Sequence, residues 1–373
     1  MMSIGIDISK KKVDVAVYNG TDYAFRTYEN SVKGAKEMIK EVKKMKSNKE
    51  LSKAKEGSAK KRGNKEEQRN SKQKEVKQEL YFVMEATGTY HLTYANTLYE
   101  KGYNAYVVNP LIIRRYGEEK LRRAKTDKAD AKLIAEFGYN NIINKANDTN
   151  SSVSHYLFRP NSETSIKIKL MLKTINQLIA LKNRNTNHME ALKQYKKEYS
   201  KESIKIFKSL NKEMDEQIKK LEKQIKALIM NTEYKETYKR VTSIPGIGKR
   251  TGSALIGYFG AFDNFENAKQ IAAYIGLNPG VKQSGKSIKK RGKISRIGSP
   301  YLRKLFYMDA LSASRYNAQC RALYERLLLK GKDKHQIFTA VGHKLLRQAF
   351  AVVKHKRIYD PAYQQSAFSN AVS

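Results

Sequence analysis

Apolar and polar residues alternate over most of the first thirty positions, the pattern of half-buried β-strands. Isoleucines at every second position give way to a lysine turn at 10–12, and valines then repeat the alternation. The apolar positions of the two runs are Ile4, Ile6, Ile8, Val13, Val15 and Val17. Residues 3–30 therefore predict two or three short strands.

A helical pattern follows over 31–45, with Ser31 as a possible N-cap. The pattern then breaks, because residues 43–79 hold 14 Lys/Arg and 6 Asp/Glu, no aromatic residue and few apolar ones. We expect this stretch to be a solvated insertion that is disordered or loosely helical.

Order resumes with the apolar run LYFVME at 80–85, which has the length of a buried strand. A helix near 90–101, a strand at 105–108 and a helix beginning near Thr126 are predicted next. Strands that alternate with helices are typical of an α/β sheet.

Residues 162–232 change to a heptad pattern, which predicts two long helices. One helix carries Met171, Ile175, Leu178, Met189 and Leu192, and the next carries Phe207, Met214, Ile218, Leu221, Ile225 and Leu228. Asn211 occupies a seam position, where a polar residue often sets register. The pair forms a coiled-coil hairpin or dimerisation arm, or alternatively a bundle packed on its own domain.

The 373 residues include 74 Lys+Arg and 36 Asp+Glu, a net charge of +38. This excess indicates a polyanionic partner, nucleic acid or an anionic membrane surface, unless it reflects only a general bias toward lysine. A single cysteine, Cys320, excludes a disulfide framework. No apolar run is long enough for a membrane span, and the N-terminus lacks a signal-peptide core, so we expect a cytoplasmic protein without a membrane partner.

Four carboxylates stand out in the N-terminal part. Asp7 lies inside the first strand, Glu85 ends the LYFVME strand, and Asp127 and Asp130 are three residues apart on one predicted helix face. Each alone has an ordinary structural explanation, such as a strand end or a helix start. Together they predict a site for two Mg²⁺ ions, or Mn²⁺ in their place, that would serve phosphodiester cleavage.

The sequence SIPGIGKRTGSALIGYFG predicts a turn between two helices that resembles a helix-hairpin-helix element. The N–H groups at such a helix start can bind a DNA phosphate, although a simple capping turn is the alternative. The candidate nucleic-acid contacts here are Gly246, Gly248, Lys249 and Arg250.

Residues 282–304 contain nine basic residues, no acid and four serines. The basic residues are Lys282, Lys286, Lys289, Lys290, Arg291, Lys293, Arg296, Arg303 and Lys304. Such a segment neutralises phosphates, and one of its serines could act as a nucleophile beside the cations. The candidate serines are Ser284, Ser287, Ser295 and Ser299, and physical reasoning alone does not choose among them.

These motifs in this order resemble transposases of the insertion-sequence-110 family, relatives of the Piv DNA invertases. The resemblance covers roughly residues 3–320 and rests on IGIDISKKKVDVAV, VMEATGTY, RRAKTDKADA, IPGIGKRTGSALIGYFGAFDNFENAKQIAAYIGLNPG and QSGKS…GKISRIGSPYLRKL. It implies a ribonuclease-H-like, RuvC-type N-terminal domain whose Asp-Glu-Asp-Asp set falls on Asp7, Glu85, Asp127 and Asp130.

The resemblance also implies a nucleophilic serine at Ser284, dimers or tetramers joined by a coiled coil, and an active site shared between subunits. Double-stranded donor and target DNA would be the substrates, and a non-coding bridge RNA from the element would guide the choice of site. The lysine-rich insertion at 43–79 has no counterpart in this family pattern.

The combined prediction has three parts. Residues 1–150 form the carboxylate domain, 160–235 the coiled-coil helices, and 236–360 a mainly α-helical domain with the helix-hairpin-helix-like element and the serine. The alternatives are a RuvC-like junction resolvase that uses water as nucleophile, and a nucleic-acid-binding protein without catalysis.

Overall fold

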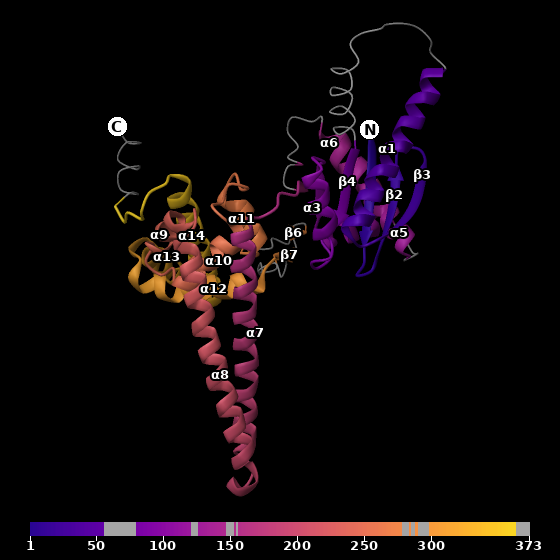
Figure 1. Ribbon diagram of the computed structural model, residues 1–373. Helices are drawn as coiled ribbons and strands as arrows, with labels where there is room; N and C mark the ends of the chain where they lie inside the picture. The colour runs from indigo at the N-terminus through magenta and orange to yellow at the C-terminus, as the bar shows by residue number, and fades with distance from the viewer. Residues whose placement is uncertain are drawn as a thin grey trace, which may run out of the picture. The chain divides into compact units, whose positions relative to one another are not determined.

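The computed structural model describes two compact units, Met1–Pro160 and Asn161–Ser373 (Figure 1). The described residues are 1–55, 80–120, 126–146, 153, 156–277, 283–284, 288–289 and 298–362. None of the helices in these residues is both long enough and apolar enough to cross a membrane.

The first unit is built on a mixed five-stranded sheet with the order β3-β2-β1-β4-β5. The strands are β1 (Met2–Ile8), β2 (Lys12–Tyr18), β3 (Tyr23–Glu29), β4 (Leu80–Glu85) and β5 (Ala105–Val108). β1 to β3 are antiparallel neighbours, whereas β4 and β5 run parallel to β1. The strands predicted from alternation and from the LYFVME run are confirmed.

Helices cover both faces of this sheet. They are α1 (Val32–Lys55), α3 (Leu92–Glu100), α4 (Pro110–Glu119) and α5 (Asp127–Gly138), followed by the short η1 (Tyr139–Ile143) and α6 (Asn144–Ala146). On one face, the isoleucines of β1 pack with Met38 of α1 and Leu98 of α3. On the other face, Ala131 and Ala135 of α5 pack against Ala16 of β2. α4 was not predicted, although Asn109 caps it and Pro110 opens it.

The first helix extends into the stretch predicted as an insertion at 43–79. The Ser31 hydroxyl accepts a hydrogen bond from the Gly34 N–H at 3.1 Å, and α1 then continues through Lys55. Met45 packs against the core and Lys46 is buried, because the helix still lies on the unit at this point. The lysines dominate the composition, but the apolar face persists for one more turn. Residues 56–79 lie outside the described part.

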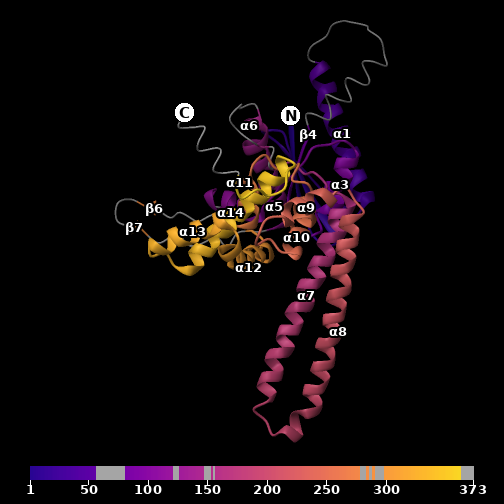
Figure 2. The same ribbon diagram turned by 90° about the vertical axis from the view of Figure 1, so that its left-hand side faces the viewer.

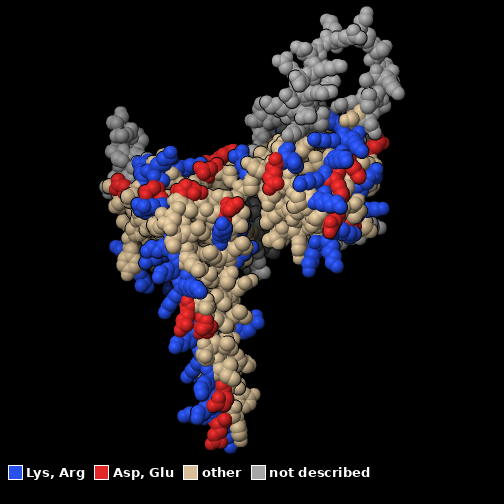
Figure 3. Space-filling model, in the orientation of Figure 1, with Lys and Arg blue, Asp and Glu red and all other residues tan. Residues whose placement is uncertain are grey.

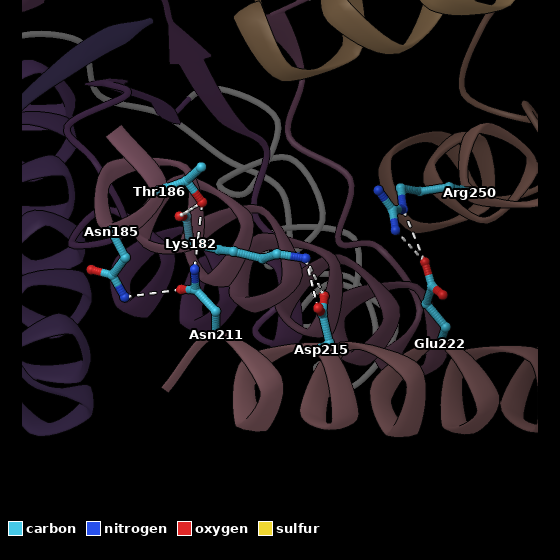
Figure 4. A network of polar contacts seen from close by, with 7 residues as sticks. All are labelled: Lys182, Asn185, Thr186, Asn211, Asp215, Glu222 and Arg250. Atoms are coloured by element: carbon cyan, nitrogen blue, oxygen red, sulfur yellow. Dashed lines mark hydrogen bonds and ion pairs between the residues drawn. The ribbon is translucent and has the colours of Figure 1, made fainter. Parts of the chain in front are cut away.

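The two heptad helices form an antiparallel hairpin within one chain, α7 (Glu163–Leu192) with α8 (Lys197–Met230) (Figures 1 and 2). Asn211 lies buried on the seam and accepts a hydrogen bond from the Asn185 side chain at 3.1 Å (Figure 4). Lys182 adds a salt bridge to Asp215 with an N–O distance of 2.6 Å. These polar contacts fix the register of the hairpin.

The rest of the second unit is helical. Its elements are α9 (Lys235–Thr242), α10 (Lys249–Phe259), α11 (Ala268–Ile275), β6 (Gln283–Ser284), β7 (Ile288–Lys289), α12 (Pro300–Tyr316), α13 (Ala318–Leu329) and α14 (Lys334–Lys354). One core joins them to the base of α7, where Ile168, Leu172 and Ile175 are buried. The base of the hairpin is therefore packed on its own domain, which was the second of the two arrangements predicted for these helices.

Candidate active site

The position of Asp7 follows from two small residues on the sheet. Gly5 and Ala16 are paired across β1 and β2, and a Cβ atom on Gly5 would lie only 2.2 Å from the Ala135 nitrogen of α5. The helix therefore packs directly on the backbone of β1. Asp7 lies two residues further along the strand and so on the same face as Gly5, towards the start of α5.

The other three predicted acids come from the elements next to β1. Met84 pairs with Ile6 in the parallel ladder, so Glu85 ends β4 beside Asp7. Asp127 and Asp130 form the first turn of α5, where the Thr126 side chain caps the helix at 3.2 Å. Acids in the first turn also interact favourably with the helix dipole.

The electrostatics of Asp7 show that the four acids are close enough to interact. Burial and the neighbouring carboxylates together raise the pKa of Asp7 to about 6; burial has the largest effect, followed by Asp130, Glu85, Asp127 and Asp14. Each negative neighbour disfavours the charged form of Asp7. Such a group of carboxylates is stabilised by a cation.

Two residues of this site were missed by sequence reasoning, Asp14 and Lys12. Asp14 is the cross-strand partner of Asp7 and accepts a hydrogen bond from the Thr27 hydroxyl at 2.7 Å. The Lys12 ammonium lies 3.2 Å from Asp14 and 2.5 Å from Asp127, and this hydrogen bond lowers the pKa of Asp127. Asp14 could have been found from the sequence because, like Asp7, it is a charged residue inside a strand of alternating apolar residues.

The donor set suits a hard divalent cation, since every predicted ligand is a carboxylate. Within the part of the chain that the structure describes, no three Asp, Glu, His or Cys side chains are arranged to hold a metal ion. The ammonium of Lys12 instead provides positive charge at Asp127. The composition of the site therefore fits Mg²⁺.

The basic serine segment is described only in part. Gln283–Ser284 pairs with Ile288–Lys289 as a short antiparallel hairpin, in which Ser284 is opposite Ile288. Ser299 caps α12 by accepting a hydrogen bond from the Leu302 N–H, so its hydroxyl is used by the fold. The residues Ser287, Ser295, Lys282, Lys286, Lys290, Arg291, Lys293 and Arg296 lie outside the described part.

The glycine turn has the predicted backbone. It connects α9 to α10, Gly246 has a φ of +105°, and a Cβ at that position would lie 2.5 Å from the Ala313 side chain. The N–H of Gly248 at the start of α10 donates to the Asp309 carboxylate, whose pKa burial raises to about 6. One of the N–H groups expected to meet a DNA phosphate thus has an internal partner.

Two of the predicted cationic contacts also have partners in the fold. Arg250 is paired with Glu222 of α8 (Figure 4), and this contact ties the glycine turn to the helical hairpin. Arg303 donates a hydrogen bond to the Ile275 carbonyl at the end of α11, at 3.0 Å. Lys249 is exposed at the start of α10, so it is the best placed of these three cations to meet a phosphate.

Comparison with known proteins identifies the chain. A family model described as "Transposase IS116/IS110/IS902 family" matches residues 238–325, and a DEDD model described as "Transposase" matches residues 60–196. The pilin gene-inverting protein of Moraxella bovis is 32% identical over 283 residues, which cover 75% of this chain and 82% of that protein. The IS110 insertion-element protein of Streptomyces coelicolor is 30% identical over 145 residues, 39% of this chain and 35% of that protein.

These matches place the chain among the transposases, enzymes that cleave and rejoin DNA. It belongs to the IS116/IS110/IS902 transposase family, as its motifs predicted.

Proposed function

We propose that this transposase recombines the DNA of its insertion element by means of a carboxylate site and a serine nucleophile. The fold of the carboxylate unit would be ribonuclease-H-like, with Asp7, Glu85, Asp127 and Asp130 as metal ligands. The observation that carries the proposal is Asp7, a carboxyl group on a strand whose pKa is raised by burial and by four other carboxylates. A bound cation would make such a group favourable at neutral pH.

The carboxylates would bind Mg²⁺, with Mn²⁺ as a substitute, and the bound ion would supply Lewis-acid activation of the phosphodiester. In the serine step, the Ser284 hydroxyl gives up its proton and its oxygen forms a bond to phosphorus. The bond from phosphorus to the sugar oxygen breaks, and this oxygen leaves as a hydroxyl. Attack by a hydroxyl of another strand reverses these changes, so a strand is exchanged without loss of a phosphodiester.

Basic residues support this step in two ways. Lys289 and its neighbours in 282–304 surround Ser284 in the sequence with positive charge, which would stabilise the negative charge that develops on the phosphoryl group. Lys12 would leave Asp127 when a metal binds and then face the phosphate backbone. Lys and Arg side chains elsewhere also extend along the α8 side of the hairpin (Figure 3).

The partners follow the same proposal. Donor and target DNA are the substrates, and a bridge RNA of the element would choose the sites by base pairing, so that the protein contacts backbone and shape. The working assembly would be a dimer or tetramer in which the carboxylates of one subunit act with Ser284 of another.

The experiment is to trap a covalent adduct on a nicked suicide substrate that carries the element ends. The parent protein should form an adduct, and Ser284→Ala should form none while it still binds DNA. Ser287→Ala, which removes a hydroxyl from the same segment, is the matched control and should retain the adduct. A parent protein that cleaves without any adduct would use water as its nucleophile, as a RuvC-like resolvase does, and the serine proposal would then fail.

A further inference from the structure

A cavity of about 480 Å³ lies in the second unit, away from the glycine turn in the sequence. α13 and α14 form two of its walls, and the segment from His355 to Asp360 forms the third. Its volume is in the range of small-molecule sites in proteins, roughly 300–1,000 Å³. The site proposed for DNA cleavage uses none of these residues.

Four cations line this cavity, one of which is Arg357, and the other three lie on its two helices. They are Arg326 of α13 and Lys344 and Arg347 of α14, and none of the ion pairs among the described residues involves them. Asp360 is also in the lining, where its carboxylate accepts a hydrogen bond from the Ala362 N–H at 2.9 Å. The three positive side chains therefore attract an anion.

The pKa shifts of residues in and near the cavity agree with a positively charged lining. Burial lowers the pKa of Lys344, and Arg326 and Arg347 lower it further, whereas Cys320 acts in the opposite direction. Burial and Arg347 also lower the pKa of His343. The buried Cys320 thiol nearby does not supply a negative charge, because burial raises its pKa to about 11. The cations repel one another, and an anion in the cavity would remove this repulsion.

The lining of the cavity also includes apolar residues and a fixed aromatic ring. Leu323, Val352 and Ile358 line the cavity, and Ile358 is 65% exposed although it is a large aliphatic side chain. Tyr359 is held in place because its N–H donates to the Ser243 hydroxyl at 2.9 Å and its hydroxyl contacts Asn317 at 3.2 Å. An aromatic ring and aliphatic surface next to cations match the two halves of a nucleotide, its base and its phosphate.

We propose that this cavity binds one unpaired nucleotide of a nucleic-acid strand, with the phosphate at Arg326, Lys344 and Arg347 and the base against Ile358 and Tyr359. The nucleotide must be unpaired, since a base that is paired with the other strand of a duplex cannot enter the cavity. DNA and RNA strands both offer this chemistry, and the experiment separates them.

The test measures binding of the full-length protein to a labelled single-stranded DNA, a single-stranded RNA of the same sequence and the corresponding DNA duplex. Three variants are compared, Lys344→Gln/Arg347→Gln, Ala351→Trp and the control Lys330→Gln/Lys332→Gln. Ala351 lines the cavity and is exposed, so the indole can fill the space without removing charge. The control removes two exposed lysines that do not line the cavity.

We expect the cavity double variant to weaken single-strand binding about tenfold and to reduce the slope of log affinity against log salt by up to ~1.4, the value for two lost phosphate contacts. Ala351→Trp should weaken the same strands, and the control should have a smaller effect on both quantities. Duplex binding should change equally in the cavity and control variants. Melting temperatures of all three should match that of the parent.

The outcome on the two single strands identifies the source of the nucleotide. If the cavity variants bind only the RNA more weakly, the nucleotide belongs to an RNA strand. If they bind only the DNA more weakly, it belongs to a DNA strand. Weaker binding of both means that the cavity accepts a nucleotide of either strand. Equal losses in the cavity double variant and the control, or parental binding by a folded Ala351→Trp variant, would overturn the proposal.

Discussion

The burial of Asp7 and the like charges around it have a cost that can be measured. The pKa of Asp7 rises from its ordinary value of 3.8 to about 6, which is roughly two pH units at about 1.4 kcal/mol each. Between these values the folded state binds more protons than the unfolded state, so stability falls as pH rises. The penalty is absent below pH 3.8 and complete well above pH 6, where it reaches about 3 kcal/mol.

The perturbation is Asp7→Asn, which keeps the volume of the side chain and removes its charge. At pH 8 in EDTA we expect the first unit of the variant to be more stable than that of the parent by up to about 3 kcal/mol. At pH 3.5 the difference should disappear. Urea titrations with a short deuterium pulse, read on peptides from β1 and β4, report on this unit separately from the helical one. Glu100→Gln, which removes an exposed acid from α3, is the control.

Added Mg²⁺ extends the same experiment. A ligand at a hundred times its dissociation constant stabilises the protein that binds it by about 2.7 kcal/mol, so Mg²⁺ should bring the parent close to Asp7→Asn at pH 8. The variant should gain less from Mg²⁺ and should not recombine DNA. A variant less stable than the parent at pH 8, or an equal difference at both pH values, would refute the argument from like charges.

Three further substitutions test other parts of the structure. Gly5→Val should lower the melting temperature of the first unit, at a cost of at least about 1–3 kcal/mol, because its side chain overlaps α5; an unchanged melting curve would contradict the close packing. Lys12→Met should tighten Mn²⁺ binding severalfold in calorimetry, since Lys12 competes for Asp127, and unchanged affinity would show that it does not. Glu222→Gln should free Arg250 and steepen the salt dependence of duplex binding by about 0.9, whereas a parental slope would mean that Arg250 makes no phosphate contact.

The fold was predictable wherever one residue pattern dominated. The alternating valines of β2 and the LYFVME run of β4 define their strands, and the heptads define α7 and α8. The end of α1 was not predictable in this way, because the high lysine content hides an apolar face that still contacts the core at Met45. Nor did the heptads show that α7 pairs with α8 of its own chain.

The four acids of the candidate site stand out in the sequence, but their surroundings do not. Asp7 stands out as a charge on an apolar strand, yet its interaction with Asp130 depends on Gly5 and the close approach of α5, which is a property of packing. The partners of Arg250 and Gly248 come from distant elements, α8 and α12. A sequence does not reveal which cations and N–H groups the fold itself will use.

The parallel pairing of β1 with β4 separates the two ends of the sheet. Leu80, the first residue of β4, is paired with Met2, whereas Asp7 and Glu85 lie at the far ends of these strands. Five residues of strand put about 17 Å between the start of β4 and the carboxylates. Residues added before Leu80 would therefore leave the acids in place, which makes this the natural position at which to insert an affinity tag or a reporter domain.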